Sequence, residues 1–191
     1  MALRLTIRGN GLERFDEAVE ILGENKARNG YRRALNEAGR DTKTATGRAL
    51  AKQTGLKVKT TRKALRESKA SSGTLEYKLT GSGGDISLKH FGARETRGGV
   101  SAAPFGRREV YDGTFMKGGK FPNRKDIGKG GHVFERTSFG RLPIRKVKSG
   151  VIIPREMVKG TTAETFQRIG STKLDEKIAK HLKLITKGVL S

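Results

Sequence analysis

Cysteine and tryptophan are both absent from this 191-residue chain. The lack of cysteine excludes a disulfide framework, a cysteine-ligated zinc site and a thiol nucleophile. Long apolar runs are missing too, and the first nine residues alternate apolar and polar side chains where a signal peptide would have a continuous apolar core. We therefore expect a protein without membrane contact that is synthesised in a reducing cytoplasm.

Catalytic and cofactor-binding patterns are equally scarce. The histidines lie in separate segments, the glycine clusters contain neither GxxxxGKS/T nor GxGxxG, and the carboxylates are scattered rather than paired. His132 and Glu135 have a spacing that suits two metal ligands on a helix, but their surroundings have a strand pattern, in which an odd offset places side chains on opposite faces. The GxxG at residues 128–131 lacks the flanking helices of a KH domain. We predict no enzyme, no cofactor and no metal.

What the chain has in excess is positive charge. Lysine and arginine number 41 against 19 aspartates and glutamates, which gives a formal net charge of +22 at pH 7. A charge of this size favours polyanions or acidic protein surfaces as partners. The length fits one domain with its own core, so we expect residues 1–191 to fold as a single unit.

Hydrophobic periodicity predicts both helices and strands in the first half. Alternation over residues 3–8 indicates a strand. Apolar residues at intervals of three and four indicate helices over 12–22 and from about 30 to 52, the second with an alanine-rich apolar stripe. A short helix over 60–68 and a β-hairpin over 75–88, with a four-residue glycine-rich turn, complete this half.

The second half begins with a segment of different composition, at about 92–131. Ten of its forty residues are glycine, and residues 89–148 carry 15 lysines and arginines against five acidic residues. Because such a segment has too few apolar residues for a core of its own, we expect a flexible basic loop or arm that orders on a partner.

Short strands are expected after this loop, at 132–136 and within 144–153, with a turn at residues 149–150. A C-terminal helix is predicted over 161–185, opened by a capping box at Thr161 and Glu164 and open to a kink or break at Gly170. The predicted fold class is therefore α+β, with long N-terminal and C-terminal helices packed on a small antiparallel sheet and a long glycine-rich basic loop.

The basic side chains of the second half are candidates for contact with DNA or with an acidic partner. Long cations in a glycine-rich segment can follow phosphates without reading base sequence, and the few aromatic residues nearby form no base-stacking pattern. The alternative for each of these side chains is that it simply contacts solvent and binds no partner. The candidates are Arg94, Arg97, Arg107, Arg108, Lys117, Lys120, Arg141, Arg145, Lys146 and Lys148.

Five short motifs in order carry a family resemblance. They are GGV at 98–100, GRREVYDGTF at 106–115, HVFER at 132–136, RLPI at 141–144 and GVIIP at 150–154. In this order and spacing the chain resembles the prophage minor tail protein Z family, the tail-completion proteins of long-tailed bacteriophages. It departs from the family pattern at Thr114, where a small residue such as alanine usually precedes the phenylalanine, and at Ile152-Ile153, where a more polar step is usual.

The resemblance implies a structural virion protein, made in the host cytoplasm and placed at the head-proximal end of the tail. It implies a homo-oligomeric ring, expected to be a hexamer, that contacts the tail terminator and the head-tail connector and lets DNA pass, with packaged DNA as an open further partner. Residues 142–144 and 151–154 would then form a hairpin or two edge strands that close the fold or pair with a neighbour. The residues expected at subunit contacts are Phe115, Val133, Phe134, Leu142, Ile144, Val151, Ile152 and Ile153.

Two other functions remain open at this point. A free-standing, non-specific nucleic-acid-binding protein would use the same positive charge and would bind DNA in a salt-sensitive way. A metal-dependent nuclease would need clustered acidic or histidine residues, and the sequence offers no such cluster.

Overall fold

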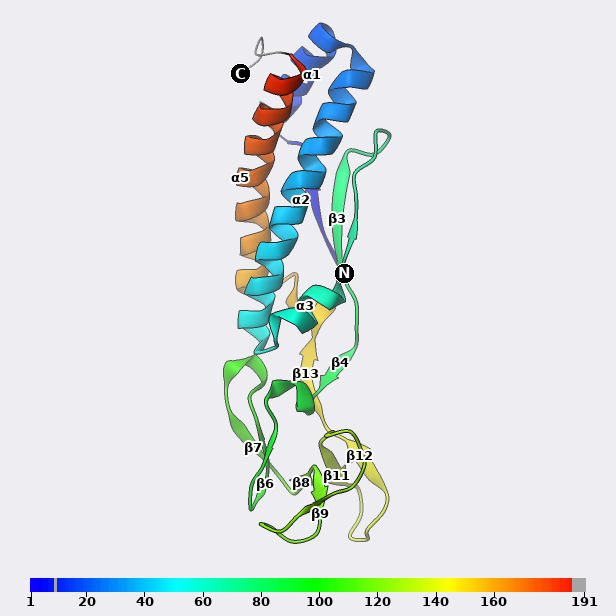
Figure 1. Ribbon diagram of the computed structural model, residues 1–191, viewed down its shortest axis with the longest axis vertical. Coiled ribbons are helices and arrows are strands. Elements are labelled where there is room, and N and C mark those ends of the chain that lie inside the picture. The colour runs from blue at the N-terminus through cyan, green and yellow to red at the C-terminus, as the bar shows by residue number, and fades with distance from the viewer. Residues whose placement is uncertain (9, 187–191) are drawn as a thin grey trace.

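Two long helices and a series of short antiparallel strands make up an elongated molecule. The computed structural model describes residues 1–8 and 10–186, and it confirms the predicted α+β class with long N-terminal and C-terminal helices. Helices α2 (Glu24–Thr54) and α5 (Gly160–Ile185) run side by side through one half of the molecule with a small sheet beside them, and the short strands from residue 85 onward fill the other half (Figure 1). Within the described residues, no helix is long and apolar enough to cross a membrane.

Helix α2 packs closely on α5 because its inner face is lined by small residues. Alanines such as Ala34 and Ala38 are fully buried, and the stripe continues through threonines. The hydroxyls of Thr42 and Thr46 donate to backbone carbonyls one turn earlier, at 2.7 Å each, so their burial leaves no polar group unpaired. This stripe of small residues explains why α2 and α5 pack closely. Ala49, beside the stripe, is only half-buried.

A three-stranded sheet covers another face of α2. Its order is β1 (Ala2–Thr6), β3 (Glu76–Gly81) and β2 (Leu65–Ser68), all antiparallel. Tyr77 in the central strand is buried against α2 at Gly39, where an added Cβ would lie 2.5 Å from the ring. The Tyr77 hydroxyl donates to Glu67 on the edge strand at 2.6 Å. Burial and this bond raise the pKa of Tyr77, and accepting the bond lowers the pKa of Glu67.

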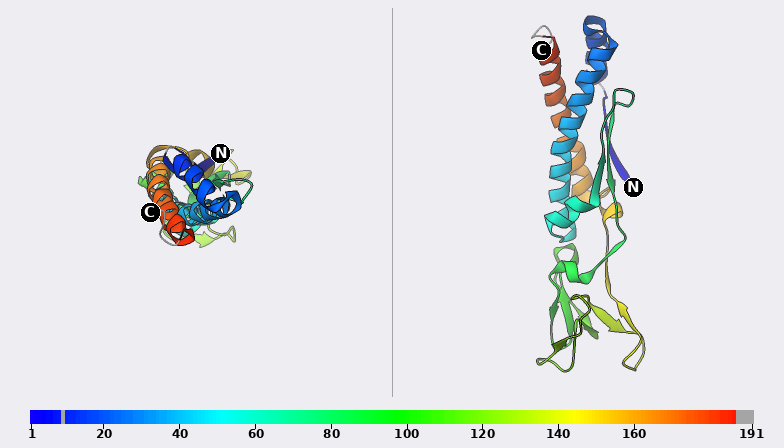
Figure 2. Two further views of the ribbon diagram at one scale, coloured as in Figure 1. Left: turned by 90° about the horizontal axis from the view of Figure 1, so that it is seen from above. Right: turned by 45° about the vertical axis from the view of Figure 1, so that its right-hand side comes forward.

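Helix α1 (Asn10–Leu22) lies on the N-terminal half of α2, at the end of the molecule opposite the strand-rich half (Figure 2). Phe15 meets Tyr31 edge to face with ring centroids 5.0 Å apart, and the Tyr31 hydroxyl donates to the Gly11 carbonyl at 3.1 Å. Burial raises the pKa of Tyr31 to about 12. The predicted helix is present, but Leu12, assigned to its apolar stripe, is exposed.

Two local predictions for the first half are wrong. The expected helix over 60–68 ends early: α3 spans Val58–Ala64, and the chain then enters β2, which pairs with β3. The expected hairpin over 75–88 does not form, because β3 pairs with β1 and β2, whereas β4 (Asp85–Ser87) pairs with β13 (Lys148–Ile152). In both cases a strand partner outside the segment itself decides the local structure, nearby in the chain for β2 and more distant for β4.

Residues 92–131 contain six short strands, so they are not one continuous loop. After the 3-10 turn η1 (Leu88–Phe91), strands β5, β6 and β7 form a sheet, followed by β8 and the β9–β10 pair, with the 3-10 turn η2 after β6. Val100 and Ala102 in β6 are fully buried and belong to the same apolar core as the long helices. The bounds are β5 Arg94–Glu95, β6 Gly99–Ala102, η2 Pro104–Gly106, β7 Glu109–Asp112, β8 Thr114–Phe115, β9 Lys117–Gly118 and β10 Lys125–Asp126.

Strand β11 (Phe134–Arg136) lies between β8 and β12 (Ile144–Lys146). The two strands predicted around residues 134 and 145 are therefore present and paired. The expected turn at 149–150 is wrong, because both residues lie inside β13, where the register against β4 is irregular. There the Ser149 hydroxyl donates to the Ile86 carbonyl at 2.7 Å, and the Gly150 N–H donates to Asp85 at 2.9 Å. Residues 142–144 and 151–154 form no hairpin with each other. Ile144 begins β12 and Val151 lies in β13, and each of these strands is at the edge of its own sheet, which was the other expected arrangement.

The start of α5 is stabilised by a side chain from α2 rather than by the predicted capping box. The residue before α5 is Lys159, and it makes no side-chain cap. Instead the Gln53 side-chain oxygen accepts from the Thr162 N–H at 3.0 Å and from its hydroxyl at 2.7 Å. The Gln53 amide group donates to the Glu156 carbonyl at 3.0 Å, at the end of α4 (Ile153–Glu156). Helix α5 also runs without a break through Gly170.

The end of α2 forms the joint with the strand-rich half. Gly55 ends the helix in the left-handed conformation, with φ of 76°. A Cβ there would lie 2.7 Å from the Ala103 carbonyl oxygen and 2.8 Å from the Gly106 nitrogen. Glycine is therefore required for both the backbone angle and the close contact with η2.

Replacing Gly39 with alanine should destabilise the fold by about 1–3 kcal/mol, because the new Cβ would overlap the buried Tyr77 ring. The same change at Gly47 in the same helix meets only the flexible Arg62 side chain, at 3.1 Å, and should stabilise by up to about 1 kcal/mol. Urea unfolding of both variants measures the difference. Equal effects at the two positions would contradict the close contact at Tyr77.

Replacing Gln53 with alanine should lower the free energy of unfolding by about 1–3 kcal/mol, because it leaves the start of α5 and the end of α4 without their shared partner. Gln167→Ala, at an exposed position of α5, is the control and should change stability by less than about 0.5 kcal/mol. Thermal and urea unfolding of both variants test the prediction. A Gln53 variant as stable as the control would show that the bonds contribute nothing net.

Candidate partner-binding surface

The ten predicted contact cations are all exposed and lie on the strand-rich half, from β5 to β13. Three of them have partners within the fold. Arg108 donates to the Gly92 and Ser101 carbonyls, Arg145 pairs with Glu135 at 2.5 Å, and Lys148 donates to the Asp85 carbonyl. Within the described residues the other side chains make no hydrogen bond or ion pair: Arg94, Arg97, Arg107, Lys117, Lys120, Arg141 and Lys146.

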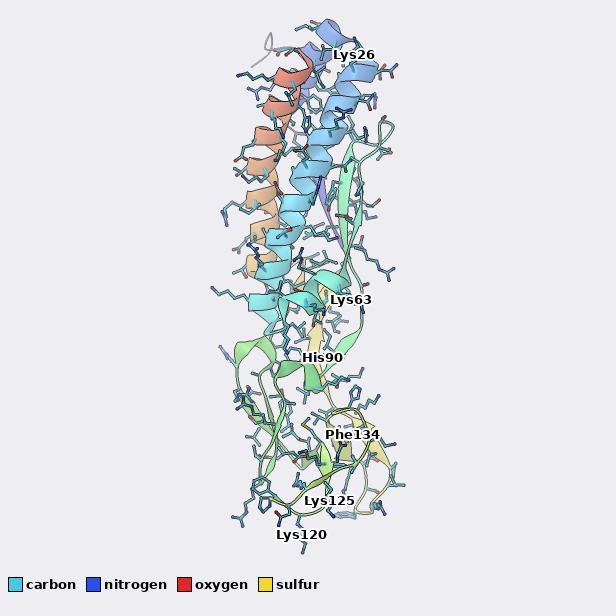
Figure 3. The ribbon with its side chains drawn as sticks, viewed as in Figure 1. Lys26, Lys63, His90, Lys120, Lys125 and Phe134 are labelled. Carbon is cyan, nitrogen blue, oxygen red and sulfur yellow. The ribbon has the colours of Figure 1, made fainter. Side chains whose placement is uncertain are left out.

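The residues expected at subunit contacts differ in exposure. The side chains of Val133, Phe134, Val151 and Ile153 are buried inside this chain. Figure 3 shows Phe134 among the strands of the lower half. Leu142 is 69% exposed. The remaining candidates, Phe115, Ile144 and Ile152, are half-buried.

Several exposed apolar side chains, most of them not among the predicted contacts, lie on the same half as the unpaired cations, and others lie on the helical half. Phe139 is fully exposed, and Phe121 is 45% exposed on the loop between β9 and β10. Figure 3 places Lys120, on this loop, and Lys125, at the start of β10, at the end of the molecule. Sequence reasoning considered Phe121 only as one of the few aromatic residues near the basic candidates, which form no base-stacking pattern, and did not name it as a subunit contact.

A partly buried ion pair orders this end of the chain. Glu95 in β5 accepts from the Met116 and Lys117 N–H groups at 2.6 and 2.7 Å, and it pairs with Arg124. One carboxylate thereby joins three segments whose own apolar residues are few. Beside it lies a cavity of about 490 Å³ lined by Phe115, Leu142 and Ile144 together with Arg136, Arg141 and Lys129. The Arg136 guanidinium lies 5.6 Å from the centre of the Phe115 ring.

A second cavity, which we call the junction cleft, lies where the two halves of the molecule meet. It has a volume of about 630 Å³ and is open to solvent. Its apolar lining comes from Ala64, Ile86 and Ile153, and its basic rim from Lys59, Lys63, Arg66 and His90. Figure 3 places Lys63 and His90 close together at this junction. Sequence reasoning assigned no binding role to Lys63 and Arg66 and missed the cleft, because β4 reaches it only through its pairing with β13.

Next to the cleft, His132 connects β4 with the strand-rich half. Its Nε2 lies 2.9 Å from Lys89 Nζ and its Nδ1 lies 3.0 Å from Ser87 Oγ. An ammonium group can only donate, so Nε2 accepts, and Nδ1 carries the proton that it donates to Ser87. Burial, followed by the charges of Lys89 and Lys146, lowers the pKa of His132. Burial and Lys89 lower the pKa of His90 as well.

Because the folded pKa of His132 lies below its unfolded value of about 6.5, its contribution to stability is complete above that value. This contribution is lost as pH falls through the folded pKa. Wild type should therefore lose more free energy of unfolding between pH 7.5 and 5.5 than His132→Gln, which cannot titrate. Between pH 7.5 and 8.5 the two should change alike. Parallel losses at low pH in urea titrations would contradict the assigned neutral form.

Nowhere in residues 1–8 and 10–186 do three histidine, aspartate or glutamate side chains gather to hold a metal ion. No protein-family model, curated protein or solved structure matches this chain. The unpaired cations and exposed apolar residues of the strand-rich half are therefore the features on which a functional proposal must depend.

Proposed function

We propose that this chain is a structural subunit of a tailed bacteriophage, a tail-completion protein that forms a ring at the head-proximal end of the tail. It is not an enzyme in this proposal. Its partners are other copies of itself, the tail terminator and the head-tail connector. The observation that carries the proposal is the surface of the strand-rich half, where seven unpaired cations accompany exposed apolar residues such as Phe139 and Leu142.

A surface that combines free cations with exposed apolar residues suits contact with proteins and with phosphates. Exposed apolar residues among charges are typical of protein interfaces, which explains why Leu142 and Phe139 are not withdrawn into the core. Non-specific phosphate contacts by lysine and arginine hold no fixed register, so they permit DNA to move past. The ordered sequence motifs that resemble tail protein Z lie largely within this same half, between residues 98 and 154.

Labelling of phage particles tests this proposal. With an epitope tag on this chain, gold-labelled antibody should appear at one band between head and tail in negative-stain electron micrographs. Removal of the gene should leave filled heads and finished tails unjoined. Particles without label, together with free protein bound to DNA in the lysate, would overturn the proposal in favour of a nucleic-acid-binding protein.

Neutralising four unpaired cations tests the role of the surface itself. A variant with Arg97, Arg107, Lys117 and Lys120 changed to glutamine should fold normally, since these side chains have no partners in the described residues, but should join few heads to tails. The matched control changes Lys26, Lys52, Arg168 and Lys183, four exposed cations of the helical half, and should join normally. Equal joining by both variants, measured as infectious particles, would exclude a role for this surface.

A further inference from the structure

Helix α1 carries the strongest acidic surface of an otherwise basic chain. Residues 10–24 contain five carboxylates and one arginine, whereas the whole chain has more than twice as many basic as acidic residues. The side chains of Glu13, Asp16, Glu17 and Glu20 are exposed. They make no ion pair or hydrogen bond within the described residues. Four carboxylates are therefore free for an external partner.

The spacing of these carboxylates places them on one face. Phe15, Ala18 and Leu22 point toward α2 and the core, so Glu13, Glu17 and Glu20 project from the opposite side of the helix. Leu12 and Ile21 flank this acidic face and are 52% and 53% exposed. An amphipathic helix face with central acids and apolar edges fits a groove with an apolar floor and a basic rim.

The junction cleft has that complementary chemistry. Its rim carries Lys59, Lys63 and Arg66, which make no ion pair or hydrogen bond within the described residues. Its lining includes Ala64 and Ile86, which are half-buried and offer apolar contacts suited to Leu12 and Ile21. The cleft rim and the acidic face of α1 are thus unpaired charges of opposite sign within one sequence.

These two surfaces cannot meet within one molecule. Helix α1 lies at the far end of the helical half, whereas α3 and β4, which line the cleft, lie at the junction with the strand-rich half (Figure 1). We propose that the acidic face of α1 docks into the junction cleft of a second copy of this chain. The proposal deepens the proposed function, because it assigns the contact by which copies associate.

The contact is heterologous, since it joins two different patches, and it therefore closes a ring or extends a filament. Rotation about a ring axis leaves every point at its own height. The acidic face and the cleft of each subunit must therefore lie at the same height along the ring axis. Because these two surfaces lie at different positions along the molecule, its long axis must be inclined to the ring axis. The pairing also reduces the mutual repulsion expected between copies with a net charge of +22.

Charge reversal on each surface tests the contact. The first variant carries Glu13→Lys, Glu17→Lys and Glu20→Lys, and the second carries Lys59→Glu, Lys63→Glu and Arg66→Glu. Analytical ultracentrifugation of the purified full-length chain at 100 mM NaCl should show oligomers of wild type. Each variant alone should associate about a hundredfold more weakly, because like charges then face each other. Circular dichroism checks that both variants remain folded.

An equimolar mixture of the two variants tests the contact most directly. In the mixture, the basic α1 of the first variant faces the acidic cleft of the second, and the acidic α1 of the second faces the basic cleft of the first. Association should return, in alternating order. Two controls reverse three exposed charges elsewhere and should assemble like wild type. They are Lys52, Arg168 and Lys183 to glutamate in one, and Glu109, Glu164 and Asp175 to lysine in the other.

Other outcomes would overturn the inference and leave the proposed function separately testable. Oligomers of wild type that persist in either folded variant would show that copies associate through another surface. Wild type that stays monomeric at 100 mM NaCl would exclude the contact, while gold label between head and tail would still support the tail role. Loss of DNA binding by the cleft variant, with unchanged assembly, would identify the cleft as a phosphate site instead.

Discussion

The close packing of α2 on α5 is the constraint on which the other parts of the structure depend. Small residues along α2 let the two helix backbones approach, and threonines in the stripe satisfy their hydroxyls on their own helix. The elements of the helical half and the joint at η2 then attach to α2. Helix α1 packs on it through Tyr31, the sheet packs through Tyr77 at Gly39, and its C-terminal end holds α4 and α5 through Gln53 and the strand-rich half through Gly55. A change along this helix therefore reaches both halves of the molecule.

The acidic and basic side chains of this chain differ in how often they have partners inside the fold. Several acidic residues are used inside the fold: Glu95 orders the end of the strand-rich half, Glu37 pairs with the cations of α5, and Glu67 accepts from Tyr77. Most cations on the strand-rich half have no such partner. The excess charge is thus left at the surface, where it repels other copies unless an acidic surface faces it. Helix α1 supplies such a surface.

Local patterns predicted the helices well because helical hydrogen bonds and periodicity lie within a few residues. The strands were harder, since their partners are distant. The hairpin expected around Tyr77 fails because β4 pairs with β13, more than sixty residues later. The capping box fails for a similar reason: Gln53, over one hundred residues earlier, takes the place that Glu164 would have had. Four apolar residues expected at subunit contacts, Val133 among them, are buried in the core because the sheets cover them.

The α+β class, the long helices, the basic character of the chain and the exposure of its cations could all be predicted from periodicity and charge. Which residues meet depends on the three-dimensional fold. It brought α3, β4 and His90 together as the junction cleft, placed the carboxylates of α1 far from it, and gave the glycine-rich segment short strands and a share of the core. The physical reason is that these contacts join residues far apart in the chain, where no local spacing records the pairing.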